Sequence, residues 1–120
     1  MVVRPTGRDR GRILRLAYCN ANSIRNKKLE LVQFLSDHGI NICLINETHL
    51  VPGQDFRMLN YVCHRKDHPT QGGGTMILVR CGIDHYSVPV LNLRQMEATT
   101  IYVNIGRRPV KLVVVYLSPL

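Results

Sequence analysis

The sequence has no apolar run near the ~20 residues that a membrane-spanning helix needs. Its start, Met1-Val-Val-Arg-Pro5, also lacks the hydrophobic region of a secretory signal. We therefore expect an intracellular protein without a membrane partner. Close cysteine pairs are missing too, because Cys19, Cys43, Cys63 and Cys81 stand far apart. Buried, reduced thiols are the first interpretation of such spacing.

A zinc site is the alternative use of two of these cysteines. Cys63 lies close to His64 and His68, and Cys81 lies four residues before His85. The two groups flank a glycine-rich turn, across which they would meet. Structural zinc sites usually contain tighter Cys-x-x-Cys pairs, so the pattern favours buried thiols over zinc.

Acidic residues are also scarce. The chain has 8 Asp and Glu against 16 Lys and Arg, which gives a formal net charge of +8. Residues 1–11 are rich in arginine and also contain Pro5 and Gly7, so we expect a flexible basic arm followed by one domain over 12–120. The arm would contact a phosphate backbone, act as a targeting signal, or form a solvated tail.

The most informative segment is an apolar run that ends abruptly in polar residues. Ile42 to Ile45 is apolar on both alternating faces, which is typical of a strand covered on both sides of its sheet. Asn46 and Glu47 follow directly. Open α/β sheets bind ligands at the carboxyl ends of such strands, so Glu47 is a candidate ligand-binding residue. A salt-bridged or solvated strand end is the alternative.

An earlier strand ends in a second polar side chain. Residues 12–20 alternate as a strand that closes on Asn20, and an apolar stripe containing Leu31 and Leu35 predicts a helix over about 26–38. Ser23 or Asn26 would cap this helix. A right-handed crossover would then leave Asn20 and Glu47 at one edge of a parallel sheet. An amide and a carboxylate at such an edge suit Mg²⁺, which completes its shell with water and phosphate.

The rest of the chain predicts further strands. Gly72–Gly74 precede a strand and no Gly-Lys-Ser/Thr follows, so we interpret them as a turn and not as a phosphate loop. The strands are expected near 57–65, 75–80, 85–90, 98–105 and 110–117, with a turn at Arg107-Arg108-Pro109. Tyr116 would share a face with Leu112 and Val114 and reach a strand end.

These motifs together resemble a known superfamily. Asn20-Ala-Asn22, Ile45-Asn-Glu-Thr-His-Leu50, Gly72–Val79, Met96-Glu-Ala98 and Lys111–Pro119 occur in the order found in the endonuclease/exonuclease/phosphatase superfamily. The Glu-Thr-His-Leu motif most resembles that of the apurinic-type endonuclease domain of non-LTR (LINE-type) retrotransposons. The resemblance covers about residues 12–120.

The resemblance implies roles for individual residues. Glu47 corresponds to the metal-binding glutamate, Asn20 to the asparagine near metal and phosphate, and Tyr116 to a phosphate-positioning tyrosine. His49 would be structural. Mg²⁺, with Mn²⁺ as a substitute, is the implied cofactor. Asn46 departs from the family, which usually has glutamine there.

The resemblance also implies that part of the catalytic machinery is absent. The family domain is about twice as long, and its second half supplies a Gly-Asp-x-Asn strand end and a closing Ser-Asp-His, neither of which we expect here. We predict an α/β fold, half of a four-layered sandwich with a mixed sheet and one helix, whose second sheet is missing and whose apolar face is exposed. Strand scission by this chain alone is not expected.

Three functional hypotheses follow. The first is the amino-terminal part of a Mg²⁺-dependent DNA-nicking endonuclease domain, with the carboxyl-terminal half or the parent retrotransposon polyprotein as its partner, acting in the nucleus. The second is a non-catalytic nucleic-acid binder. The third is a phosphatase or abasic-site repair relative. Nucleic-acid contacts are expected from Asn22, Arg25, Lys27 and Lys28, which otherwise form a solvated helix face.

Overall fold

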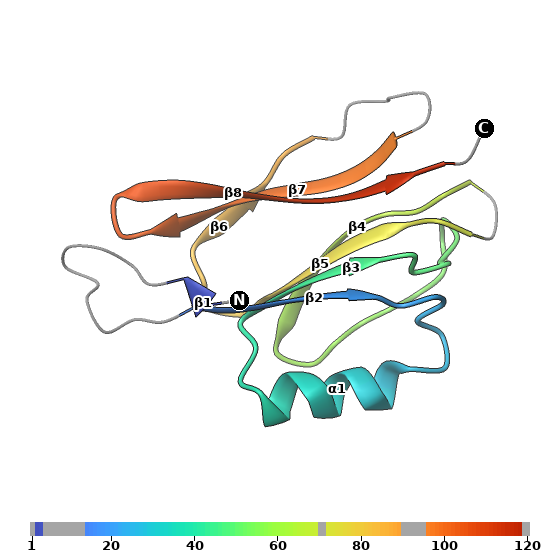
Figure 1. The fold of residues 1–120 in the computed structure, drawn as a ribbon, viewed down its shortest axis with the longest axis horizontal. Helices are drawn as coiled ribbons and strands as arrows, with labels where there is room; N and C mark the ends of the chain where they lie inside the picture. Colours follow the sequence, from blue (N-terminus) through green and yellow to red (C-terminus); the bar gives the residue numbers. More distant parts are fainter. Residues whose placement is uncertain (1, 4–13, 70–71, 90–95, 119–120) are drawn as a thin grey trace.

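The computed structural model describes residues 2–3, 14–69, 72–89 and 96–118, which form two packed β-sheets and one helix. Figure 1 shows three layers, with β6–β8 on one side of the first sheet and α1 on the other. The arrangement confirms the predicted α/β class. The expected basic arm falls mostly on residues 4–13, which lie outside the described residues, but Val2–Val3 form a short strand, β1.

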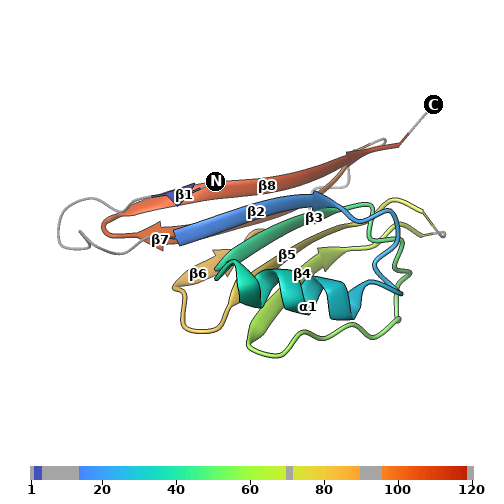
Figure 2. The same cartoon turned by 60° about the horizontal axis from the view of Figure 1, so that its bottom comes forward.

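The first sheet has the strand order β1-β2-β3-β5-β4. Its strands are β1, β2 (Leu14–Asn20), β3 (Ile42–Asn46), β5 (Thr75–Arg80) and β4 (Tyr61–Lys66). β2 and β3 run parallel with Asn20 opposite Asn46, whereas β5 is antiparallel to both of its neighbours. The parallel pair therefore ends its two strands side by side, as the crossover predicted (Figure 2).

Helix α1 (Lys28–Asp37) makes the crossover between β2 and β3. Leu31 and Leu35 are buried as predicted, but Leu29 is 85% exposed and does not extend the apolar face. The predicted cap by Ser23 or Asn26 is wrong, because Lys27 occupies the N-cap position without a side-chain cap bond. The chain forms a loop between β2 and the helix, so that the helix begins at Lys28 and not at about residue 26.

β3 is buried on both faces, which confirms the interpretation of its apolar run. Cys43 and Ile45 contact the helix side of the core, while Ile42 and Leu44 contact the second sheet. All four side chains are less than a tenth exposed. A strand in this central position holds its last residues firmly, which is why the polar pair that follows it has a defined geometry.

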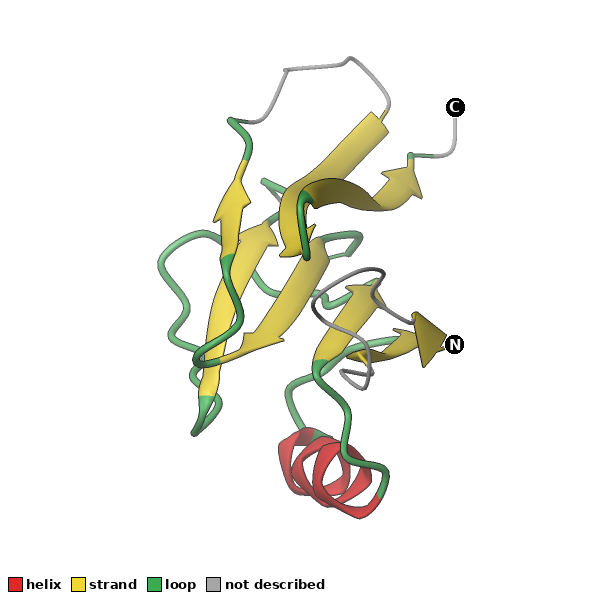
Figure 3. Ribbon diagram, turned by 90° about the vertical axis from the view of Figure 1, so that its left-hand side faces the viewer, coloured by secondary structure: helices red, strands yellow, loops and turns green. Residues whose placement is uncertain are grey.

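The second sheet has the order β6-β7-β8 and packs on the first. It consists of β6 (His85–Ser87), β7 (Met96–Ile105) and β8 (Arg108–Leu117). Figure 3 shows this sheet on the opposite side of the first sheet from the helix. The prediction that the second sheet is missing is therefore wrong. Ile101, Val103 and Val114 cover the apolar face that was expected to be exposed.

The hairpin between β7 and β8 is tighter than predicted. Ile105 pairs with Arg108, so the turn consists of Gly106 and Arg107, and Pro109 already belongs to the strand. Gly106 has a φ of 64°, a left-handed conformation that glycine adopts without strain. Within the part of the chain that is described, no helix is long and apolar enough to cross a membrane.

Two glycines with similar backbones allow a test of the packing before β5. Gly74 and Gly53 have φ of 91° and 87°. A Cβ on Gly74 would lie 2.3 Å from Oγ1 of Thr48, which is fully buried, whereas a Cβ on Gly53 would meet nothing within 4 Å. We expect Gly74→Ala to lower the free energy of unfolding by about 1–3 kcal/mol more than Gly53→Ala. Urea unfolding measures the difference, and equal losses would contradict the packing described here.

Candidate metal and phosphate site at the edge of the first sheet

The loops that follow β2 and β3 continue the pairing of the two strands. The amide of Ala21 donates to the carbonyl of Asn46 at 2.8 Å. Ser23 N–H then donates to the Glu47 carbonyl at 3.0 Å, and Ile24 N–H to the Thr48 carbonyl at 3.0 Å. This backbone ladder fixes the position of the polar residues at both strand ends.

Backbone strain gathers in these same loops. Five non-glycine residues in the described ranges have positive φ, and four of them belong to the two paired loops. They are Asn22, Ser23, Glu47 and His49, with φ of 43°, 80°, 55° and 57°. Left-handed conformations are costly for residues with a Cβ and persist where surrounding contacts enforce them, often at functional sites.

The structure brings Asn20 and Glu47 together, as predicted. Asn20 Nδ2 donates a hydrogen bond to Glu47 Oε2. Asn20 Oδ1 accepts the backbone N–H of Asn22 at 3.1 Å, which fixes the orientation of the amide group. The amide therefore presents its N–H to the carboxylate, so that Asn20 orients Glu47 and does not turn its own oxygen toward the same space.

Asn46 connects this edge to the second sheet. Its Nδ2 donates to the Val115 carbonyl at 2.7 Å, and its Oδ1 accepts the backbone N–H of Glu47 at 2.8 Å. The side chain thus satisfies a carbonyl of β8 and holds the first residue of the left-handed turn. The side chain of Asn46 therefore links the first sheet to the second.

The glycine segment before β5 forms the third side of the site. The backbone N–H of His49 donates to the Gly73 carbonyl at 2.9 Å. A Cβ on Gly73 would lie 2.7 Å from Cε1 of Tyr116, so the tyrosine ring covers this backbone closely. His68 contacts the same ring edge-on at 6.5 Å between centroids. Tyr116 therefore lies beside the loops that hold Glu47.

A second carboxylate at this edge was not predicted as a site residue. Glu97 lies opposite Tyr116 in the β7–β8 ladder, and its Oε1 accepts the N–H of Gly74 at 3.3 Å. The sequence signal was the lone acidic residue within an otherwise uncharged strand. Its significance depends on the second sheet, whose placement over the glycine segment the sequence alone did not reveal.

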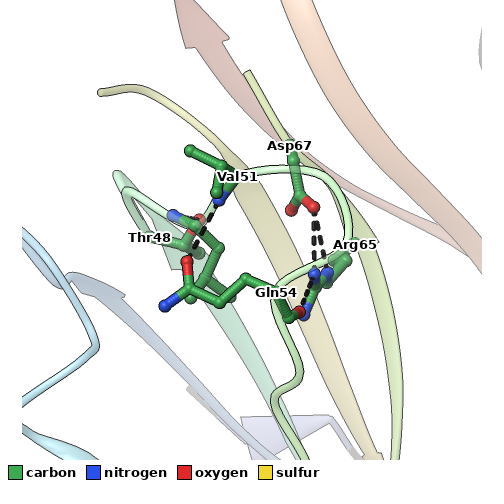
Figure 4. A network of polar contacts seen from close by, with 6 residues as sticks. Thr48, Val51, Gln54, Arg65 and Asp67 are labelled. Carbon is green, nitrogen blue, oxygen red and sulfur yellow. Dashed lines mark hydrogen bonds and ion pairs between the residues drawn. The ribbon is translucent and has the colours of Figure 1, made fainter. Parts of the chain in front are cut away.

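A polar network supports the loop that leaves the site. Figure 4 shows Gln54 bridging Val51 and Arg65. Its Oε1 accepts the Val51 N–H at 3.3 Å, and its carbonyl accepts the guanidinium of Arg65. Arg65 also pairs with Asp67 at 3.0 Å in a mostly buried ion pair. The loop after Glu47 is thereby tied to β4.

The predicted nucleic-acid contacts lie at the same end of the sheet. Asn22, Arg25, Lys27 and Lys28 are all exposed. Two of the cations have intramolecular partners as well, since Lys27 Nζ donates to the carbonyls of Ala21 and Asn22, and Lys28 Nζ lies 5.7 Å from the centre of the Phe56 ring. Arg25 is therefore the clearest candidate for an intermolecular contact.

The four cysteines are free thiols. A hydrogen bond from Cys43 lowers the pKa of Cys19 to about 7, while burial raises the pKa of Cys63 to about 11. Among the described residues no group of three or more His, Cys, Asp or Glu is placed to hold a metal. The larger zinc cluster considered from the sequence is thus not assembled, although His64 and His85 do meet.

One expectation about the sequence itself was wrong. The Ser-Asp-His motif does occur, at Ser36-Asp37-His38. These residues end α1 and its C-cap, and the chain then returns to the start of β3. They consequently lie toward the opposite end of β3 from Glu47 and do not supply the histidine that the family places at its site.

The comparisons with known proteins concern the fold and the sequence. No family model matches the chain. The fold is similar to that of a humanized D. rerio TDP2, with a TM-score of 0.64 and 14% identity over 89% of this chain and 48% of that one. It is also similar to the 3′ phosphatase NExo from Neisseria, solved with a product DNA hairpin, with a TM-score of 0.55 and 17% identity over 82% of this chain and 40% of that one.

The sequence relatives come from mobile elements. The chain is 33% identical over 92 residues to the RNA-directed DNA polymerase from mobile element jockey of Drosophila funebris, covering 75% of this chain and 10% of that protein. It is 26% identical over 108 residues to the jockey protein of Drosophila melanogaster, covering 88% of this chain and 12% of the relative.

The two solved structures show the class of fold to which the chain belongs, because both share its arrangement of helix and sheets. In sequence, the chain is similar to RNA-directed DNA polymerase proteins of mobile elements and spans about a tenth of their length. The resemblance predicted from the motifs is confirmed.

The role of Asn46 as a link between the sheets gives a stability prediction. Asn46→Ala would leave the Val115 carbonyl and the Glu47 N–H without their partners, so we expect a loss of about 1–3 kcal/mol in the free energy of unfolding. Asn104→Ala is the matched control, because Asn104 is exposed and bonds only at the surface to Asp84. Chemical denaturation of both variants tests the link, and a smaller loss for Asn46→Ala than for the control would refute it.

Proposed function

We propose that this chain is the amino-terminal part of a Mg²⁺-dependent, DNA-nicking endonuclease domain of a retrotransposon protein, acting in the nucleus. The observation that carries the proposal is the Asn20–Glu47 contact at the shared end of β2 and β3. An oriented carboxylate at the carboxyl ends of parallel strands is placed as ligand sites in α/β sheets usually are. The mobile-element relatives support DNA as the partner.

The donor atoms at this edge fit a hard cation. Glu47 is half-buried and its carboxylate is held by Asn20, and Glu97 adds a second carboxylate across the glycine segment. Mg²⁺ takes one or two carboxylates and keeps water and phosphate in its remaining positions, and Mn²⁺ accepts similar oxygen ligands. When bound, the cation would polarise a phosphate oxygen and offset its charge.

The other residues have positioning roles in this proposal. Asn20 keeps the Glu47 carboxylate in one orientation, because both ends of its amide are engaged. Tyr116 would contact the scissile phosphate from the strand end of β8, next to the glycine segment. Side chains that hold the reacting atoms in the correct orientation lower the activation barrier of the reaction.

We propose that the residues that activate the attacking water come from elsewhere in the parent polyprotein. The chain covers 48% and 40% of the two solved relatives, so much of their fold has no counterpart here. The outer face of the second sheet exposes apolar side chains that such a partner segment would cover. They include Tyr86, Val113 and Leu117, which are 52%, 42% and 68% exposed.

The role of Glu47 is tested by its amide variant. Glu47→Gln keeps the shape of the side chain but removes its charge, so we expect Mg²⁺ affinity of the 120-residue chain to fall by about tenfold or more. Glu30→Gln, which changes an exposed helix carboxylate, should leave the affinity unchanged. Titration calorimetry measures both variants.

The same two variants, Glu47→Gln and Glu30→Gln, should be compared for DNA nicking by the protein encoded by the full parent reading frame. We expect nicking to be lost in Glu47→Gln and retained in Glu30→Gln. Undiminished Mg²⁺-dependent nicking by Glu47→Gln would reject the assignment of the metal site.

A non-catalytic nucleic-acid binder is the second candidate function, favoured by the exposed cations next to Asn22. Arg25→Gln should weaken binding to duplex DNA and reduce the slope of log affinity against log salt by about one. Lys111→Gln is the matched control, because Lys111 is exposed on a strand of the second sheet. Equal effects of the two variants would argue against a binding surface at Arg25. Binding that is independent of Glu47 would favour this second function over the first.

A further inference from the structure

The two sheets meet through a pair of histidines that the proposed endonuclease site does not use. His64 lies on β4 of the first sheet and His85 on β6 of the second. Their Nε2 atoms are 2.8 Å apart, and the rings meet edge-on with 5.0 Å between centroids. Both side chains are partly buried. Two ring nitrogens that face each other across a sheet interface need either a shared proton or a shared cation between them.

The protonation pattern of the pair follows from one backbone contact. Nδ1 of His85 lies 2.8 Å from the carbonyl of Ile83, so Nδ1 carries the hydrogen and Nε2 of His85 presents its lone pair. In the metal-free protein the hydrogen between the rings therefore belongs to Nε2 of His64. A ring N–H that donates to a backbone carbonyl is also how metal-bound histidines are usually oriented.

We propose that His64 and His85 form a two-histidine site for a divalent transition-metal ion such as Zn²⁺, which would link the two sheets. Imidazole nitrogen suits Zn²⁺, Cu²⁺ and Ni²⁺, whereas Mg²⁺ prefers oxygen ligands. The site is therefore chemically distinct from the Glu47 edge.

Binding requires the two rings to separate and to turn. Tetrahedral Zn²⁺ with bonds of about 2.0–2.1 Å places two ligand nitrogens roughly 3.3 Å apart, so the nitrogens must separate by about 0.5 Å and both rings must tilt until their lone pairs point at the ion instead of at each other. The hydrogen on Nε2 of His64 moves to Nδ1 of the same ring, which frees the second lone pair without net proton release.

The surroundings leave room for the remaining ligands. A cavity of about 480 Å³ is lined by His64 together with Ser87, Thr99 and Thr100. Water molecules in this cavity would complete the coordination shell. Because no third His, Cys, Asp or Glu among the described residues joins the pair, the site has an open coordination sphere and binds more weakly than a closed four-ligand zinc site.

The experiment is a Zn²⁺ titration of the 120-residue chain, followed by calorimetry and by the melting temperature. We expect one zinc-dependent site and a rise in melting temperature, since a ligand that binds only the folded state stabilises it. His64→Gln and His85→Gln should each lower Zn²⁺ affinity by about tenfold or more. His38→Gln, which changes an exposed helix-end histidine, should leave it unchanged.

Two further controls distinguish zinc binding at this site from zinc binding at a thiol and from Mg²⁺ binding. Cys81→Ser removes an exposed thiol that could bind zinc by itself, and we expect it to retain the site. Excess Mg²⁺ should not compete. Melting curves of the histidine variants without metal show whether they fold. The proposal is overturned if folded His64→Gln and His85→Gln bind Zn²⁺ as the unchanged chain does, if Cys81→Ser abolishes binding, or if no binding occurs up to about 1 mM Zn²⁺.

Discussion

The pairing of β2 with β3, extended beyond the strands themselves, is the constraint on which the candidate site depends. Hydrogen bonds from Ala21, Ser23 and Ile24 carry the ladder into the loops, where several residues adopt left-handed conformations. Such conformations cost of order 1–3 kcal/mol each and need surrounding contacts to enforce them. The buried β3 strand supplies that support, because both of its faces lie in the core. The contact between Asn20 and Glu47 is a product of this rigid frame.

Local sequence patterns were sufficient for the parts of the structure that local chemistry determines. The apolar run before Glu47 predicted a strand covered on both faces, and the stripe of Leu31 and Leu35 predicted the helix that packs there. The order strand, helix, strand then predicted that Asn20 and Glu47 would meet, because a right-handed crossover leaves parallel strands with their carboxyl ends together.

Features that depend on long-range packing were not predictable in this way. The second sheet was thought to be missing, since alternating residues in β7 and β8 do not reveal which surface they cover. Glu97 joins the site only because that sheet packs over the glycine segment, and Asn46 reaches Val115 across 69 positions of the chain. The helix start was also misplaced, because the backbone of residues 21–24 pairs with residues 46–48 and the helix begins only at Lys28.

The glycine segment before β5 has a consequence for comparing this chain with related sequences. A methyl group at Gly73 would clash with the Tyr116 ring, and one at Gly74 would clash with Thr48, so neither glycine can be replaced without a local shift. Thr48 directly follows Glu47, so a side chain at Gly74 would disturb the backbone next to that carboxylate. A related sequence that keeps the acidic residue but replaces either glycine should therefore differ from this chain in the shape of the sheet edge.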